Sequence, residues 1–120
     1  MTRRGLILLV AAAVGAVGAH PVGAHHGWSG YDSDKPLTLT GVIRESGYEH
    51  PHGHVRLEVE GARTWLVVLA PPSRMENRGL PASALTVGTK ATVMGYPSRK
   101  DPVEMRAERI TVSGKTVELR

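Results

Sequence analysis

The fold is decided in the stretch Val55-Arg56-Leu57-Glu58-Val59-Glu60, where apolar and charged residues alternate without a break. Because successive side chains of a β-strand point to opposite faces, this alternation predicts a strand with one buried and one solvated face. The loop Gly61-Ala62-Arg63 leads into Thr64-Trp65-Leu66-Val67-Val68-Leu69. That continuous apolar run predicts a strand covered on both faces, with Trp65 in the core. The centre of the chain is therefore expected to be a β-hairpin.

Further strands are expected on both sides of this hairpin. Residues 37–45 alternate before it, and residues 89–96 and 103–112 follow it, with 115–120 as a last short strand. In the segment 103–112 the apolar positions change phase once. One set faces inward at Val103, Met105 and Ala107, with Glu104, Arg106 and Glu108 outward, and the inward set then resumes at Ile110 and Val112. Such a one-residue slip predicts a β-bulge, which bends a strand around a small barrel.

A short helix is expected between the third and fourth strands. Ser73 and Glu76 have the spacing of a capping box, and Gly79 stands where a left-handed C-terminal cap is needed. The order strand, strand, strand, helix, strand, strand is typical of the OB fold. The expected fold is all-β, a five- to six-stranded OB-like Greek-key barrel with this one short helix. An open sandwich of five or six strands is the alternative.

The beginning of the chain has the three parts of a cleaved signal peptide. Arg3 and Arg4 precede an uncharged run from 5 to 19, and Val22-Gly23-Ala24 is a small-residue cleavage site. A transmembrane helix needs about 20 apolar residues, so a retained membrane anchor is the less favoured alternative. The paired arginines also leave twin-arginine export open beside the ordinary secretory route.

These features predict three parts and an envelope or extracellular location. We expect a signal peptide at 1–24, a lead segment at 25–35 and the barrel domain at 36–120, in a periplasmic or secreted protein without a transmembrane span in its mature form. There is no cysteine, so a disulfide framework and thiolate metal sites are excluded. Residues 1–24 hold two of the 15 basic side chains and none of the 11 acidic ones, which leaves a net charge of +2. With no dense basic stripe, nucleic acid is not expected as a partner.

Cleavage would give the mature chain a histidine at its start. A cut after Ala24 makes His25 the first residue, and a cut after Ala19 exposes His20 instead. A terminal amine and the imidazole of the same residue can chelate one metal ion. Nitrogen ligands without thiolate suit Cu(II), Zn(II) or Ni(II), and Cu(II) binds most tightly among these ions.

A second group of histidines lies in the loop between the first two strands. His50, His52 and His54 are two residues apart, so in an extended chain they would face the same side. We therefore expect a copper(II) site formed by His25 and His52, supported by His26, His50 or His54. The alternative is that these histidines are ordinary polar loop residues.

Aromatic residues offer a second kind of site. Trp28, Tyr31 and Tyr48 could hold a protein, a glycan or a small envelope ligand, which would make the domain a metal-free binding module. Trp28 alternatively fixes the chain end onto the barrel. Asp32 and Asp34 are expected to cap a turn, because the calcium-loop pattern is incomplete.

Several short motifs resemble those of domain-of-unknown-function family 6152, a group of small exported bacterial proteins. They include His25-His26-Gly27-Trp28, Lys35-Pro36-Leu37, Pro51-His52, Ala70-Pro71-Pro72 and Arg78-Gly79. The resemblance implies export and a β-barrel but no reaction. It also implies that His52 is the family's histidine, while His50 replaces a frequent asparagine. No nucleophile, base and orienting group can be assembled, so we expect a non-catalytic protein, with copper-dependent oxidation as a less favoured alternative.

Overall fold

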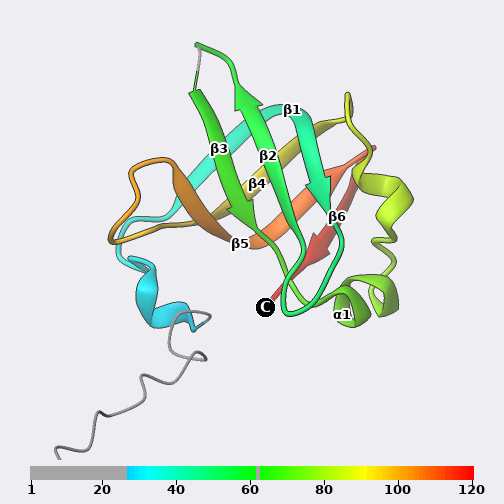
Figure 1. Cartoon of the computed structure of the whole chain (residues 1–120), viewed down its shortest axis with the longest axis horizontal. Helices are drawn as coiled ribbons and strands as arrows, with labels where there is room; N and C mark the ends of the chain where they lie inside the picture. The colour runs from blue at the N-terminus through cyan, green and yellow to red at the C-terminus, as the bar shows by residue number, and fades with distance from the viewer. Residues whose placement is uncertain (1–26, 62) are drawn as a thin grey trace, which may run out of the picture.

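The computed structural model describes residues 27–61 and 63–120. Its strands are β1 (Leu37–Gly47), β2 (His54–Val59), β3 (Arg63–Val68), β4 (Lys90–Pro97), β5 (Glu104–Val112) and β6 (Lys115–Glu118). Its helices are the 3-10 turns η2 (Trp28–Gly30) and η3 (Ala82–Leu85) and the α-helix α1 (Pro72–Asn77). Figure 1 shows the strands curving around one interior, with α1 at one end of the barrel.

Five of the strands close into a barrel of the OB type. The sheet order is β3-β2-β1-β4-β5-β6, and an additional pairing between β3 and β5 closes the ring. All neighbouring pairs are antiparallel except β3 and β5, which run parallel over Leu66–Val68. β6 extends the sheet as a hairpin with β5. The predicted fold class, with its short helix between the third and fourth strands, is confirmed.

The predicted bulge in β5 is present and places a carboxylate at the bend. Met94 of β4 pairs with Arg109, whereas the next residue, Gly95, pairs with Ala107, so Glu108 has no opposite residue. Met105, Ala107 and Ile110 are nevertheless all buried, because the slip returns the inward phase after Glu108. The core consists of these residues and the inward positions of the other strands, among them Ile43, Val55, Leu57, Val67 and Val93.

The burial of Arg106 differs from what the alternation in β5 predicts. Arg106 was expected on the solvated face, but it is only 5% exposed. Arg106 lies opposite Val68 in the parallel pairing, on the outer face of the barrel, and the segment around η2 covers it there. The strand periodicity gave the correct face, but it could not show that another segment lies over that face.

The prediction that β3 is covered on both faces is wrong. Only Val67 is fully buried in β3, while Leu66 and Val68 are half-buried. These two point away from the core because their partners in β2 are the outward Arg56 and His54. Trp65 is half-buried and packs against the core from its edge rather than inside it.

The helix α1 begins differently from the prediction. Its N-cap is Pro71, with Pro72 in the first turn and no side-chain cap, so the Ser73–Glu76 capping box does not form. Proline suits this position because its missing N–H would have no helical partner. The C-terminal cap is confirmed, since Gly79 has a φ of +83° and the N–H of Leu80 donates to Met75 O at 2.8 Å.

The predicted signal peptide and the residues His20, His25 and His26 lie outside the described residues. Asp32 caps a turn as expected, because its Oδ1 accepts a hydrogen bond from the N–H of Asp34 at 3.1 Å. In the described part of the chain, no helix has the length and apolar character needed to cross a membrane.

Candidate ligand-binding site

The segment around η2 is fastened to the outside of the barrel beside the β4–β5 loop (Figure 1). Tyr31 forms a β-bridge with Ser98. The N–H of Asp32 donates to Pro97 O at 2.9 Å, and the N–H of Arg99 donates to Gly30 O at 3.0 Å. Backbone hydrogen bonds therefore fix this segment on both sides of Tyr31, and Trp28 is held at its beginning.

Two guanidinium groups lie against the indole ring of Trp28. The guanidinium carbons of Arg106 and Arg120 are each 4.5 Å from the ring centroid. The ring of Tyr96 meets the same indole edge-on, with the centroids 6.0 Å apart. Trp28 thus joins η2 to β4, to β5 and to Arg120, two residues after β6. Its predicted role in fixing the chain end onto the barrel agrees with these contacts.

Arg106 connects Trp28 to the histidine loop. Its Nη2 is 3.1 Å from Nε2 of His52, a distance that fits a guanidinium donating to an unprotonated ring nitrogen. Burial lowers the pKa of Arg106, and Arg74 and Arg120 lower it further through charge repulsion, while Tyr31 acts in the opposite direction. A guanidinium remains charged in proteins, so this face of the barrel keeps a concentrated positive charge.

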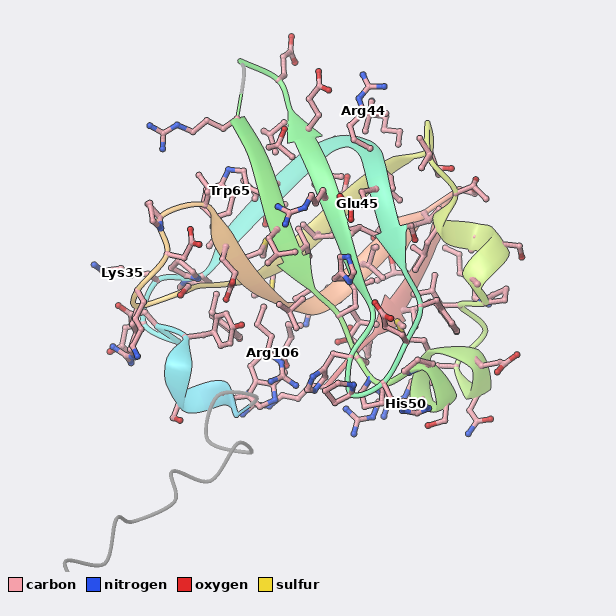
Figure 2. All side chains as sticks on the ribbon, viewed as in Figure 1. Lys35, Arg44, Glu45, His50, Trp65 and Arg106 are labelled. Atoms are coloured by element: carbon pink, nitrogen blue, oxygen red, sulfur yellow. The ribbon has the colours of Figure 1, made fainter. Side chains whose placement is uncertain are left out.

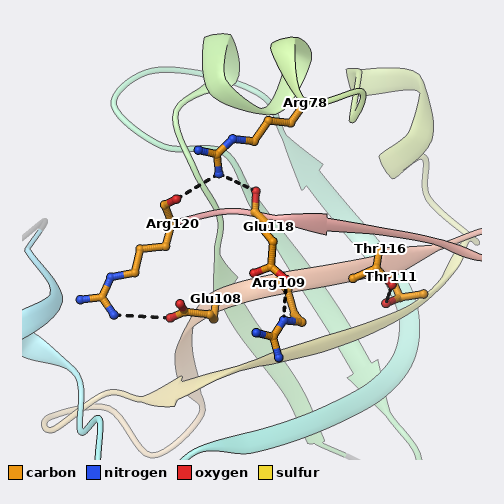
Figure 3. A network of polar contacts seen from close by, with 7 residues as sticks. All are labelled: Arg78, Glu108, Arg109, Thr111, Thr116, Glu118 and Arg120. Carbon is orange, nitrogen blue, oxygen red and sulfur yellow. Dashed lines mark hydrogen bonds and ion pairs between the residues drawn. The ribbon is translucent and has the colours of Figure 1, made fainter.

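Arg120 lies at the end of a polar network that runs along β5 and β6 (Figure 3). Its Nη1 is 3.6 Å from Oε2 of Glu108, the bulged residue of β5. Arg78 donates hydrogen bonds to the carbonyls of Glu118 and Arg120 at 2.8 and 3.0 Å, which fixes the backbone there. The backbone of Arg120 is therefore held, while its side chain is 56% exposed.

Tyr31 forms the floor of the site. It is 7% exposed, and its hydroxyl donates to Oε2 of Glu104 at 2.9 Å. Burial raises the pKa of Tyr31 strongly, and the hydrogen bond to Glu104 and the charge of that carboxylate raise it further. The phenol is therefore a neutral, fixed donor at every physiological pH.

Two hollows open beside this floor. The smaller has a volume of about 250 Å³ and is walled by Trp28 and Tyr96, with Arg99 and Arg120 at its rim. The larger has a volume of about 460 Å³ and lies between η2 and the β4–β5 loop, with Lys100, Asp101 and Glu104 among its lining residues. Ser29, Tyr31 and Arg99 line both hollows. We call the two together the Trp28 cleft.

The histidines of the β1–β2 loop do not gather around one point. His50 is exposed and His54 lies 3.9 Å from Oε1 of Glu45, while His52 contacts Arg106 (Figure 2 labels His50, Glu45 and Arg106). Hydrogen bonds between Gly53 and the residues after β3 hold the loop, with the N–H of Gly53 donating to Ala70 O at 2.9 Å. Within residues 27–61 and 63–120, no three His, Asp or Glu side chains form a group suited to a metal ion.

The described residues fit a copper ion poorly. The Nε2 atom of His52 is engaged by a guanidinium, and a positive charge beside a ligand opposes the binding of a divalent cation. His25 and His26 are outside the described residues, so their part in such a site stays a prediction.

Tyr48 lies in a different place from Trp28 and Tyr31. Its hydroxyl is 2.7 Å from Leu80 O and 3.2 Å from Pro72 O, so it ties the beginning of the β1–β2 loop to α1. The Trp28 cleft instead contains residues that the sequence did not single out as a site, namely Tyr96, Arg99 and Arg120, and Arg106 stacks on its indole. The one available signal was the pair Arg99-Lys100, the densest positive charge outside residues 1–24.

The closed barrel with its helix between the third and fourth strands defines an OB-type β-barrel protein. The chain belongs to a family of unknown function (DUF6152), whose model matches residues 12–105. No curated protein shows significant similarity to its sequence.

Solved structures agree on the fold. "OBody NL8 bound to hen egg-white lysozyme" is similar with a TM-score of 0.52 and 16% identity, over 68% of this chain and 96% of that one. "OBody AM3L09 bound to hen egg-white lysozyme" gives a TM-score of 0.50 and 17% identity, over 68% and 83% of the two chains.

Proposed function

We propose that this protein is an exported, non-catalytic binding module that holds an anionic ligand in the Trp28 cleft. The observation that carries the proposal is the presence of two arginine side chains, Arg99 and Arg120, at the rim of one aromatic-walled hollow. Export is supported by the pattern of residues 1–24, which has the charged start, apolar run and small-residue site of a signal peptide.

The two arginines are poorly neutralised by their own neighbours. Arg99 is 4.0 Å from Asp32, and Arg120 is 3.6 Å from Glu108. Both distances exceed the limit of about 3.2 Å for a good N–H···O hydrogen bond. The side chains of Arg99 and Arg120 are 54% and 56% exposed, so a carboxylate or phosphate on a ligand can reach these guanidiniums from solvent.

The stacking on Trp28 prepares Arg120 for such a ligand. A guanidinium that lies against an aromatic ring keeps the N–H groups at its edge available, and that edge matches a carboxylate or phosphate in a bidentate way. Arg106 stacks on the same indole and is only 5% exposed, so it adds positive charge to the site without contacting solvent freely. The arrangement is therefore attractive to anions.

The smaller hollow is suited to hold an anion, and the carboxylates of the cleft, Asp101 and Glu104, lie in the larger hollow. The lining of the smaller hollow among the described residues consists of Trp28, Ser29, Tyr31, Ser33, Tyr96, Arg99 and Arg120. None of these is a histidine or a carboxylate, the groups that most often act as general bases.

The test is a thermal-unfolding series of the exported protein in sodium acetate and in sodium chloride at equal ionic strength. A ligand that binds the folded state at ten times its Kd stabilises it by about 1.4 kcal/mol, which raises Tm by several degrees in a domain of this size. We expect this rise in the wild type and in Arg63→Gln, a control that removes an exposed charge of β3. The rise should be absent in Arg120→Gln. Equal Tm values in both salts would contradict the proposal.

We propose copper(II) binding through His25 and His52 as a second candidate function. It is favoured by one observation, the chain of contacts from Trp28 through Arg106 to His52, which brings the beginning of the described chain to the histidine loop. His25 stands only three residues before Trp28 in the sequence. The positive guanidinium of Arg106 beside His52 disfavours the binding of a copper ion there.

Mass spectrometry of the exported protein and Cu(II) titration test this second candidate. It requires a mature chain that begins with His25 and an affinity that falls at least tenfold in His52→Ala. A different first residue, or an affinity unchanged by His52→Ala, would remove it without affecting the anion site.

A further inference from the structure

We infer that the ligand of the Trp28 cleft is an acidic saccharide in which a uronate unit adjoins a neutral sugar unit. This inference rests on the proposed function and adds the chemical class of the ligand. It follows from the different charges of two hollows that share one wall.

The smaller hollow suits a sugar ring that carries a carboxylate. Tyr96 supplies flat apolar surface, against which the C–H face of a sugar ring can pack, and the charged lining residues are both cations, Arg99 and Arg120, the latter stacked on Trp28. A carboxylate on that ring would meet guanidinium edges. Ser29 and Ser33 add hydroxyl groups, which both donate and accept hydrogen bonds.

The larger hollow has mixed charge and suits a neutral, hydroxyl-rich unit. Lys100 donates hydrogen bonds, while Asp101 and Glu104 accept them. A sugar hydroxyl does both, so one neutral sugar can form hydrogen bonds with all three side chains. A second negative charge in this hollow would meet two carboxylates as well as Arg99 and Lys100, so it would gain less than in the smaller hollow, where both charged lining residues are cations.

The loop that presents these groups is fixed in advance. Ser98 Oγ accepts hydrogen bonds from the N–H groups of Lys100 and Asp101 at 3.2 and 3.1 Å. Asp101 Oδ1 accepts one from the N–H of Val103 at 2.9 Å. Binding would therefore not require the backbone of this loop to be ordered first, which lowers the entropic cost.

The same charges argue against nucleic acid. Every nucleotide unit carries a phosphate, so a strand that follows both hollows would place a phosphate against Asp101 and Glu104.

Isothermal titration calorimetry of the exported protein tests the inference with four probes. They are the disaccharide glucuronyl-glucose, its neutral counterpart cellobiose, diglucuronate and a dinucleotide. We expect glucuronyl-glucose to bind at least tenfold more tightly than each of the other three. Arg99→Gln should reduce its affinity at least tenfold, and Arg63→Gln, far from the cleft, should leave it unchanged.

One substitution distinguishes the two hollows. Asp101→Asn keeps the oxygen that accepts from Val103 but removes a negative charge from the larger hollow. It should raise the affinity for diglucuronate several-fold and change that for glucuronyl-glucose by less than twofold. The circular-dichroism melt of each variant shows whether it is folded.

The outcomes separate the two proposals. Tighter binding of the dinucleotide, or equal affinities for all saccharides, would overturn the saccharide inference. If the acetate-dependent rise in Tm persisted in that case, anion binding would stand. If neither saccharides nor acetate had an effect, both proposals would fall.

Discussion

The guanidinium of Arg106 lies 4.5 Å from the ring centroid of Trp28, so a residue of β5 and a residue before β1 form one stacked pair on the outer face of the barrel. Cation–π pairs contribute about 0.5–1 kcal/mol when exposed and about 2 kcal/mol or more when desolvated. Since Arg106 is 5% exposed, this pair belongs near the upper part of that range. The pair fixes the segment that forms one wall of the cleft.

Removal of the indole should therefore destabilise the whole domain as well as the cleft. For Trp28→Ala we expect the free energy of unfolding to fall by about 2 kcal/mol, because the stacking on Arg106 and Arg120 and half-buried apolar area are lost. Trp28→Phe keeps a ring and should lose about half as much. Urea unfolding followed by circular dichroism measures both. A loss below about 0.5 kcal/mol in Trp28→Ala would mean that the pair does not fix the segment.

Alkaline pH should destabilise the protein through its tyrosines. The pKa of Tyr31 is raised above its ordinary value of 10.0, and those of Tyr48 and Tyr96 are raised as well, in each case chiefly by desolvation. Above pH 10 the unfolded chain loses these protons while the folded chain keeps them, so the free energy of unfolding falls as pH rises. Below pH 10 both states are protonated, and the contribution is fully present.

The contribution of Tyr31 to this pH dependence can be measured from the slope of the free energy of unfolding against pH. One fully shifted tyrosine contributes a slope of about 1.4 kcal/mol per pH unit above pH 10. Tyr31→Phe should reduce the slope by about that amount between pH 10 and 11, in urea-unfolding curves recorded at each pH. If the slopes of wild type and Tyr31→Phe were equal, the phenol would not be held protonated by its burial and its contact with Glu104.

Tyr48 should matter for stability but not for the ligand. Tyr48→Phe removes the hydroxyl that donates to Leu80 O, and leaves a carbonyl without that partner, at a cost of about 1 kcal/mol. Its affinity for glucuronyl-glucose should match that of the wild type. A tenfold loss of affinity would place Tyr48 in the site and contradict the separation from Trp28.

At position 95, where β4 pairs with β5 beside the bulge, only glycine should be tolerated. A Cβ on Gly95 would collide with the backbone carbonyl of Arg106 and with Ala107, whereas one on Gly30 would meet nothing within 4 Å. For Gly95→Ala we expect a loss of more than about 2 kcal/mol, because backbone must move on one of the two strands. Gly30→Ala, the matched control, should change stability by less than about 0.5 kcal/mol. Equal stabilities of the two variants would contradict the close approach of Gly95 to the backbone of β5.

The barrel could be predicted from local patterns because the alternation of apolar and polar residues within each strand shows which side chains face inward. The alternation at 55–60 and the phase slip before Ile110 gave two strand faces and the bulge correctly. Errors arose where a distant segment decides the environment. Arg106 looked solvated in its strand and is covered by η2, and the apolar run of β3 faces outward at Leu66 and Val68.

The cleft was less predictable than the fold for the same reason. Trp28 and Tyr31 were identified as candidates because aromatic residues are few in this chain. Their partners come from the β4–β5 loop and from the segment after β6, and no local spacing connects Trp28 with Arg99 or Arg120. Only the closure of the barrel brings these elements together.

The most direct test of the account follows the indole N–H signals in a ¹H–¹⁵N NMR titration of the protein. The chain has two tryptophans, Trp28 in the cleft and Trp65 at the edge of the core, so the second is an internal control. We predict that glucuronyl-glucose shifts the Trp28 signal in a saturable way and leaves that of Trp65 in place. A Trp28 signal that does not move at any concentration of this disaccharide, or of acetate, would contradict the assignment of the cleft as an anion-binding site.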